Sequence, residues 1–265
     1  MQTQELPNVD YKQAQNQFLL LWNQEQFDKN PPELIGKNKH RIQPKDLKIK
    51  QENIFCAALG KKFNQKTLEE KKHEWEVNDS STYPQIGENI SHLFLYGHST
   101  WRTIQNNQNQ TVRGISCVQH FISGDELGKF IVKMLGGTEG IQNRKTFLVI
   151  WLLTCYGASE DMKTDNKEIN NDTDTISDKS PQSDTETSPI LAQALLNSFP
   201  PAMGRTVVAY DKPVTTKTLS ACRTFAATYK TGMDAISKLV EHKEMLQTEV
   251  NLKIFSPGEL GKTLD

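Results

Sequence analysis

Residues 145–159 read KTFLVIWLLTCYGAS and contain the longest apolar run of the chain. An uninterrupted apolar run that is rich in β-branched and aromatic residues is typical of a strand covered on both faces. The run is too short to cross a bilayer as a helix, and it begins with a lysine. We therefore predict the central strand of an α/β sheet, with Cys155 delivered to the carboxyl edge, where open α/β sheets bind their ligands.

Working outward, strand and helix patterns alternate along the chain. The patterns predict strands at 17–22, 92–96, 205–210 and 250–255, and helices at 49–63, 123–135, 189–199 and 218–242. Residues 101–113 are rich in Asn and Gln and are predicted to form an exposed loop. This alternation favours a single α/β domain over residues 15–265 with a mostly parallel sheet, after a flexible N-terminus at 1–14.

One helix and one insert have clear local signals. Ser123 can cap the helix that follows it, the acidic Asp125 and Glu126 suit its positive end, and Gly136-Gly137 should end it. Residues 160–188 consist mainly of Asp, Ser, Thr, Asn and Lys, with almost no apolar side chain. Such a segment cannot offset its ordering entropy by burial, so the insert is predicted to be disordered.

Composition and charge exclude several classes of function. The formal net charge is −1, which argues against a nucleic-acid-binding protein. The 4 cysteines are widely separated, which indicates free thiols in a reducing compartment, and the histidines show no zinc-ligand spacing. The sequence predicts neither a Sec signal nor a membrane-spanning segment. A soluble protein rich in Asn, Gln and Lys suits a bacterial effector that is delivered into a host without a Sec signal.

A thiol and an imidazole follow two of the predicted strands. His98 comes directly after HLFLYG, and Cys155 comes after KTFLVIWLLT. Adjacent parallel strands lie about 5 Å apart, so both side chains would reach one substrate. The imidazole can act as the base for the thiol. Backbone N–H groups at Gly97, Ser99 and Cys155 can form an oxyanion hole.

These residues resemble a known family. The run HLFLYGHS, then SGDELGKFIVKML, KTFLVIWLLTCYGAS, SPILAQALLNSF and GRTVVAYDKPV is similar to the core of the caspase-like cysteine peptidases. It is most similar to the self-cleaving peptidase domains of large bacterial toxins. The resemblance covers residues 91–214 and includes the order His before Cys. It implies a three-layer α/β/α sandwich, with Cys155 as nucleophile and His98 as base.

The resemblance implies further roles and has two departures. It implies a substrate pocket near Tyr210 and Asp211, and an inositol polyphosphate activator that could bind the basic segment 37–50; no other cofactor is implied. Protein or peptide substrates are implied, including a self-cleavage site in 160–188, where Asp172-Thr173-Asp174 lies. The family usually has Gly after the His, where this chain has Ser99. The long insert at 160–188 also follows the Cys directly, where caspases have their activation linker; the alternative is a surface insertion without a role.

Two other functions remain open from the sequence. Gly97-His98-Ser99 resembles the start of the nucleophile elbow of an α/β-hydrolase, and Asp211 and His242 follow in the order of a Ser-Asp-His triad. Trp101 stands where the second elbow glycine belongs, which counts against an esterase. The non-enzymatic alternative is an interaction protein that has a caspase-like fold and no activity.

Overall fold

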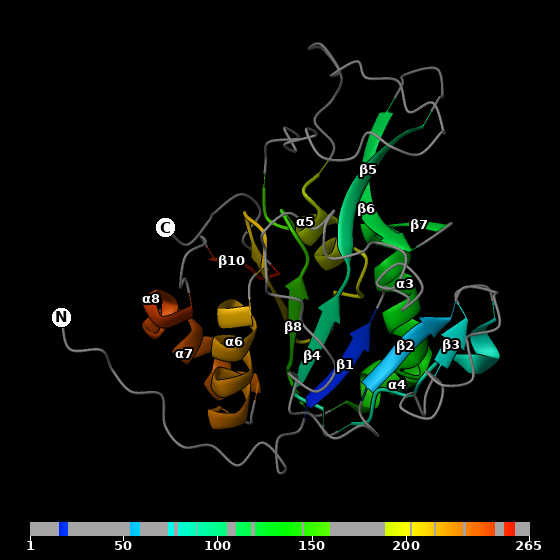
Figure 1. Ribbon diagram of the computed structural model, residues 1–265. Helices are drawn as coiled ribbons and strands as arrows, with labels where there is room; N and C mark the ends of the chain where they lie inside the picture. The colour runs from blue at the N-terminus through cyan, green and yellow to red at the C-terminus, as the bar shows by residue number, and fades with distance from the viewer. Residues whose placement is uncertain are drawn as a thin grey trace, which may run out of the picture.

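The computed structural model describes thirteen stretches of the chain, and all statements below refer to them: residues 16–20, 54–58, 74–76, 79–88, 90–104, 110–117, 120–144, 146–159, 189–201, 203–214, 216–229, 232–246 and 252–257. A seven-stranded sheet forms the centre, and a three-stranded sheet lies beyond the carboxyl ends of its central strands (Figure 1).

The large sheet is almost entirely parallel. Across the sheet, the strands are β10 (Leu252–Phe255), β9 (Arg205–Tyr210), β8 (Leu148–Leu153), β4 (His92–Tyr96), β1 (Asn16–Leu20), β2 (Ile54–Ala58) and β3 (Glu74–Glu76). Each neighbouring pair is parallel except β9 and β10, which are antiparallel. This confirms a mixed α/β fold with a mostly parallel sheet, and strands stand at all five predicted places.

Strand β8 separates two apolar cores. Ile150 and Leu152 face a core formed with α3 (Gly124–Met134), α4 (Gly137–Asn143) and α5 (Leu191–Asn197). Val149 and Trp151 face a second core, formed with α6 (Thr216–Thr228), α7 (Gly232–Glu241) and α8 (Lys243–Leu246). Helices therefore cover both faces of the sheet (Figure 1), an arrangement compatible with α/β/α layers. Every side chain of β8 is fully buried, which explains its continuous apolar sequence.

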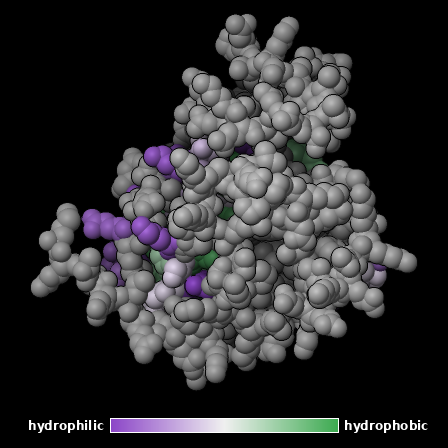
Figure 2. Space-filling model, in the orientation of Figure 1, coloured by the Kyte–Doolittle hydropathy of each residue, from purple (hydrophilic) through white to green (hydrophobic). Residues whose placement is uncertain are grey.

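The surface on the α7–α8 side is largely polar. In Figure 2, hydrophilic side chains of described residues stand out over this side, and hydrophobic ones are visible only in small areas. Among the large hydrophobic residues of the described ranges, Val240 is the exposed one. None of the helices in these ranges has the length and apolar character that crossing a membrane requires.

The predicted signals at both ends of α3 are confirmed. The Ser123 hydroxyl accepts a hydrogen bond from the Glu126 backbone N–H at 3.2 Å, and the Glu126 carboxylate accepts one from the Ser123 backbone N–H at 2.9 Å. This reciprocal capping box satisfies two donors of the first turn. Gly136 has φ 86°, a left-handed conformation that suits glycine and ends the helix. The short helix α4 that follows was not predicted.

Two predictions of secondary structure are wrong. The helix expected over 49–63 is strand β2 at Ile54–Ala58, which pairs in parallel with β1. A short apolar run fits either state, and here strand pairing decides it. The exposed loop expected over 101–113 lies largely in an antiparallel hairpin of β5 (His98–Ile104) and β6 (Gln110–Cys117), to which β7 (His120–Ser123) adds. The β-branched residues on either side of the Asn/Gln-rich segment favour strands.

Three predicted segments lie outside the described residues: the flexible N-terminus at 1–14, the basic segment at 37–50 and the insert at 160–188. Flexibility, inositol polyphosphate binding and self-cleavage stay predictions there. The single domain over 15–265 also stays a prediction, although strands from residue 16 to residue 255 share the large sheet.

Candidate active site

The carboxyl ends of β4 and β8 lie side by side. Tyr96 is the last residue of β4 and pairs with Leu153, the last residue of β8. Because the two strands are parallel, the segments that follow them emerge at one edge of the sheet. His98 lies two residues past the end of β4, and Cys155 lies two residues past the end of β8. The backbone thus brings both predicted catalytic residues to a common edge.

A direct contact joins the two segments. The Ser99 hydroxyl donates a hydrogen bond to the carbonyl oxygen of Cys155. His98, the residue before Ser99, begins β5, and its backbone lies opposite Ser116 of β6. The imidazole of His98 is outside the side chains that the structure describes, so its approach to the Cys155 sulfur stays a prediction.

Cys155 lies in a tight turn after β8. Its side chain is partly exposed. The next residue, Tyr156, has φ 58° and is the non-glycine residue of the described ranges with a left-handed backbone. Such strained conformations persist where the surrounding structure enforces them, and they cluster at functional sites. At Gly157 a Cβ atom would come within 2.8 Å of Thr154 Oγ1, so the close approach here requires glycine.

Hydrogen bonds from three elements fix this turn. The Ala158 N–H donates to the carbonyl of Tyr210, the last residue of β9, at 2.9 Å. The Gly157 carbonyl accepts from the Ala192 N–H of α5 at 3.1 Å. The Arg113 guanidinium of β6 donates to the Ser159 carbonyl. The turn after β8 is therefore held by β9, α5 and β6 at once.

The surroundings of Cys155 favour its neutral thiol. Burial raises the pKa of this thiol above its ordinary value, and the backbone N–H groups of Val214 and of Cys155 itself offset part of the rise. Burial also raises the pKa of Cys222, to about 12. The described groups therefore favour the protonated Cys155 thiol at neutral pH, and a reaction that uses its thiolate would need a base.

Of the two residues expected to line a substrate pocket, the structure leaves one at the surface. The Tyr210 side chain is 0% exposed, and its hydroxyl lies 3.0 Å from Cys222 Sγ inside the α6 core. Side chains alternate between the two faces of a strand, and the Tyr210 side chain points into the core formed with α6, α7 and α8. The prediction that the Tyr210 side chain lines a substrate pocket is therefore wrong, because this side chain is part of the core. Asp211, just beyond β9, is partly exposed.

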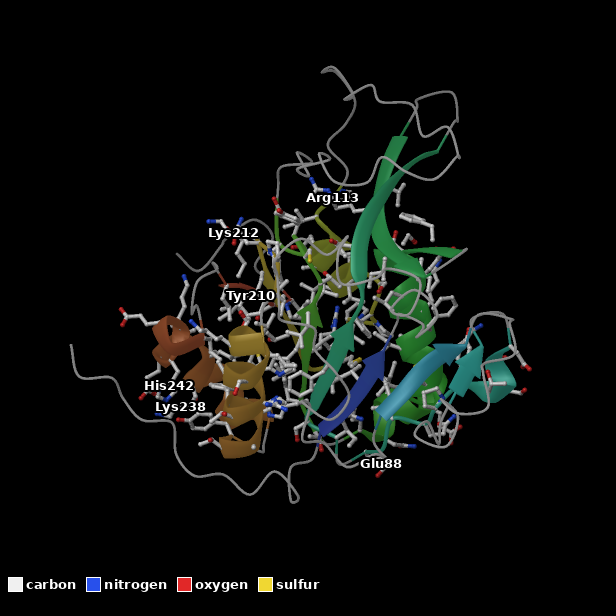
Figure 3. All side chains as sticks on the ribbon, viewed as in Figure 1. Glu88, Arg113, Tyr210, Lys212, Lys238 and His242 are labelled. Atoms are coloured by element: carbon white, nitrogen blue, oxygen red, sulfur yellow. The ribbon has the colours of Figure 1, made fainter. Side chains whose placement is uncertain are left out.

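The structure does not bring the alternative Ser-Asp-His triad together. His242 Nε2 lies 2.6 Å from the Tyr229 hydroxyl, and the Tyr229 carbonyl lies 2.6 Å from Nε2 of His92, the first residue of β4. This network sits at the amino end of the strand, whereas Ser99 lies beyond its carboxyl end. In Figure 3, His242 lies at the lower left, on the side of α7 and α8, whereas Arg113 and Lys212 lie higher in the picture. Ser99 also lies in a strand, while a nucleophile elbow leads into a helix.

The buried His92 gives the fold a titratable group at the edge far from Cys155. Trp151 Nε1 donates to its Nδ1 at 3.2 Å, so its Nε2–H donates to the Tyr229 carbonyl. Both ring nitrogens are thus satisfied in the neutral form. Burial lowers the pKa of His92 to about 4.

The free energy of unfolding is expected to fall by about 3 kcal/mol between pH 7 and pH 4 because of His92 alone. The unfolded chain takes up a proton at His92 near the ordinary pKa of about 6.5, but the folded chain does so only near pH 4. Stability is therefore fully present above the unfolded value and declines as the pH falls below it. Urea unfolding of the wild type and of His92→Gln at several pH values measures this. If both proteins show the same pH dependence, His92 does not titrate as described.

Sequence analysis missed two contributors to the site. Arg113 lies in the segment predicted to be an exposed loop, yet in TVRGIS it is two residues from Ile115, the spacing that puts two side chains on one face of a strand. Val214 acts through its backbone N–H, which no side-chain pattern can show. Within the described ranges, no three His, Cys, Asp or Glu residues gather as metal ligands would.

Comparison with known proteins adds no family to these observations: no family model matches the chain, and no curated protein matches it significantly.

Proposed function

We propose that the protein is a cysteine peptidase with a caspase-like α/β/α fold, in which Cys155 is the nucleophile and His98 the general base. The observation that carries the proposal is the junction of β4 and β8. Their parallel pairing and the contact between Ser99 and the Cys155 carbonyl place the two chain positions at one edge. The resemblance over residues 91–214 supports the same pair of residues.

In the proposed reaction, His98 takes the proton of the Cys155 thiol as the sulfur attacks the carbonyl carbon of a peptide bond. The carbonyl oxygen becomes an oxyanion, which backbone N–H groups at Gly97, Ser99 and Cys155 stabilise. When the C–N bond breaks, the imidazolium gives its proton to the leaving amine, and a thioester remains on Cys155. His98 then activates a water molecule, which hydrolyses the thioester and restores the thiol.

The neutral resting thiol fits this sequence of steps. A general base can raise the reactivity of a thiol whose own pKa is high, if it removes the thiol proton when the substrate binds. The substrate is a protein or peptide, and the partly exposed Asp211 lies at the edge to which β9 leads, where it can contact the residues beside the cut. No observation favours the esterase alternative, because its His242 lies at the other end of β4.

The proposal is tested by covalent labelling with a mixed library of peptidyl fluoromethyl ketones. Mass spectrometry should find the label on Cys155, at least about a hundredfold faster than on the buried Cys222, whose thiol is almost fully protonated. The rate should saturate with inhibitor concentration, because a peptide must bind before the sulfur attacks its ketone.

A matched variant separates a peptidase from an interaction protein with a reactive thiol. His98→Ala should label much more slowly with the ketones, while iodoacetamide, which reacts with the thiolate that the solution pH supplies and needs no oxyanion hole, should still alkylate Cys155. If the ketones label wild type and His98→Ala equally, or leave Cys155 unmodified, the peptidase proposal is wrong and the interaction protein is favoured.

A further inference from the structure

The β5–β6 hairpin presents one face to the turn that carries Cys155. Ser99 of β5 lies directly opposite Ile115 of β6, so their side chains share a face of the small sheet. Arg113 is two residues before Ile115 and lies on that face too, because strand side chains alternate. Ile115 is 0% exposed and belongs to the core, which identifies this face as the inward one.

Two side chains on this face hold the turn at its two ends. Ser99 donates to the carbonyl of Cys155, and Arg113 donates to the carbonyl of Ser159. Between these contacts, the Ser159 N–H closes the turn on the Tyr156 carbonyl at 3.1 Å. Both ends of the turn are thus tied to the β5–β6 hairpin, which also contains His98.

The hydrogen bond from Ser99 to the Cys155 carbonyl affects the position of the Cys155 thiol. A peptide unit is planar, so a hydrogen bond that fixes the Cys155 carbonyl also fixes the direction of the next N–H. It thereby constrains Tyr156, whose φ of 58° is disfavoured for a residue with a side chain. When the hydrogen bond is removed, we expect this residue to relax toward an ordinary conformation, and the thiol to leave the Val214 N–H.

We propose that Ser99 and Arg113 are positioning residues, which hold the turn 155–159 so that the Cys155 sulfur keeps a fixed orientation toward His98. The proposal rests on the proposed peptidase function and deepens it, because neither side chain touches the reacting atoms in the proposed mechanism. It also gives a role to the one residue, Ser99, at which this chain departs from the glycine usual in the family that it resembles. The serine supplies a hydroxyl donor that glycine lacks.

The test compares Ser99→Ala and Arg113→Met with the wild type and with the conservative Arg113→Lys. Turnover of a fluorogenic peptide library should fall by about tenfold to a hundredfold in the first two variants, with KM changed by less than about threefold, because a nucleophile displaced by about 1 Å is badly aligned. Arg113→Lys keeps a cationic donor and should recover part of the turnover. The double variant should lose less than the product of the two single losses, since both residues hold one turn.

A second readout needs no peptidase activity. Burial raises the pKa of the Cys155 thiol more than the Val214 N–H lowers it. A loosened turn that exposes the sulfur should therefore lower this pKa on balance, even with that hydrogen bond lost, and speed alkylation by iodoacetamide about threefold to tenfold at pH 8. Turnover and alkylation thus move in opposite directions, whereas a residue that acts as acid or base would slow turnover without exposing the thiol. The pH dependence of alkylation at Cys155, followed by mass spectrometry, supplies the measurement.

Arg144 supplies the matched control. Its guanidinium also binds backbone carbonyls, those of Gly87, Ile90 and Thr146, but next to the start of β8 rather than its end. Arg144→Met should lower stability and leave both turnover and Cys155 alkylation unchanged. The positioning proposal is overturned if Ser99→Ala and Arg113→Met leave alkylation at the wild-type rate, or if Arg144→Met changes it equally. If the wild type has no peptidase activity but the alkylation rates shift as expected, the proposed function fails and the positioning role stands.

Discussion

Replacing Cys155 by alanine is expected to lower peptide hydrolysis by about 10⁴-fold or more, to the level of the binding groups alone. Without the sulfur no thioester can form, and the remaining backbone donors only polarise the substrate. The side chain is partly exposed and lies in a turn outside the two cores, so its loss should leave the fold intact. The measurement is the turnover of a fluorogenic peptide library, with the melting temperature followed in parallel.

Cys222→Ala is the matched control for this prediction. Cys222 is fully buried beside the Tyr210 hydroxyl and lies in the α6 core, away from the β8 turn. Its replacement should cost about 1–2 kcal/mol of stability through lost packing and a lost hydrogen bond, and should preserve turnover. If Cys155→Ala retains more than about a hundredth of wild-type turnover, the nucleophile is another residue and the proposed mechanism falls.

The buried core of the fold was predictable because burial leaves a pattern. Strand β8 is covered on both faces, so its sequence is continuously apolar, and β4 and β9 repeat the pattern in shorter form. The ends of α3 were predictable because a capping box and a left-handed glycine are local signals. Strand β2 was not predictable in the same way, because a short apolar run becomes a strand only through its neighbours.

The sequence predicted which chain segments meet at the site, because the direction of the strands decides this. Two parallel neighbours must deliver their following residues to one edge, and the Ser99–Cys155 contact shows that the two segments meet there. What the sequence could not predict depends on pairing between distant segments. Arg113 reaches Ser159 only because β5 and β6 form a hairpin, and Tyr210 points into the core because of the register of β9 beside β8. The pairing register of β5 with β6, and that of β9 with β8, cannot be predicted from a local sequence pattern.

Replacing Arg205 is expected to lower the free energy of unfolding more than any other substitution proposed above. It begins β9, is 4% exposed, and donates only to backbone carbonyls, those of Leu196, Phe199, Pro200 and Met203, at 2.7 to 3.3 Å. Helix α5 ends at Asn197, so its last carbonyls lack partners within the helix. The guanidinium adds donors to the Leu196 carbonyl in this last turn, beside the Phe199 N–H, and its positive charge suits the negative end of the helix dipole.

Arg205→Met is expected to lower the free energy of unfolding by about 3–5 kcal/mol, because it removes a charged donor from four carbonyls. The carbonyls of Leu196 and Pro200 keep a backbone N–H donor, whereas those of the buried Phe199 and Met203 lose the donor that the guanidinium supplies. Arg205→Lys keeps the charge but replaces a planar fork of five N–H groups by one ammonium with three, so it should recover only part of the loss. Equilibrium unfolding in urea, with the slope compared between variants, measures both effects.

Arg144→Met again provides the control for this prediction, since Arg144 binds three carbonyls but is more exposed than Arg205. Water can replace its hydrogen bonds, so its loss should cost about 1 kcal/mol. The burial of Arg205 predicts the difference between the two variants, because three of its four carbonyl partners belong to the buried residues Leu196, Phe199 and Met203. Equal losses for Arg144→Met and Arg205→Met would show that solvent reaches the end of α5 as easily as it reaches the surface.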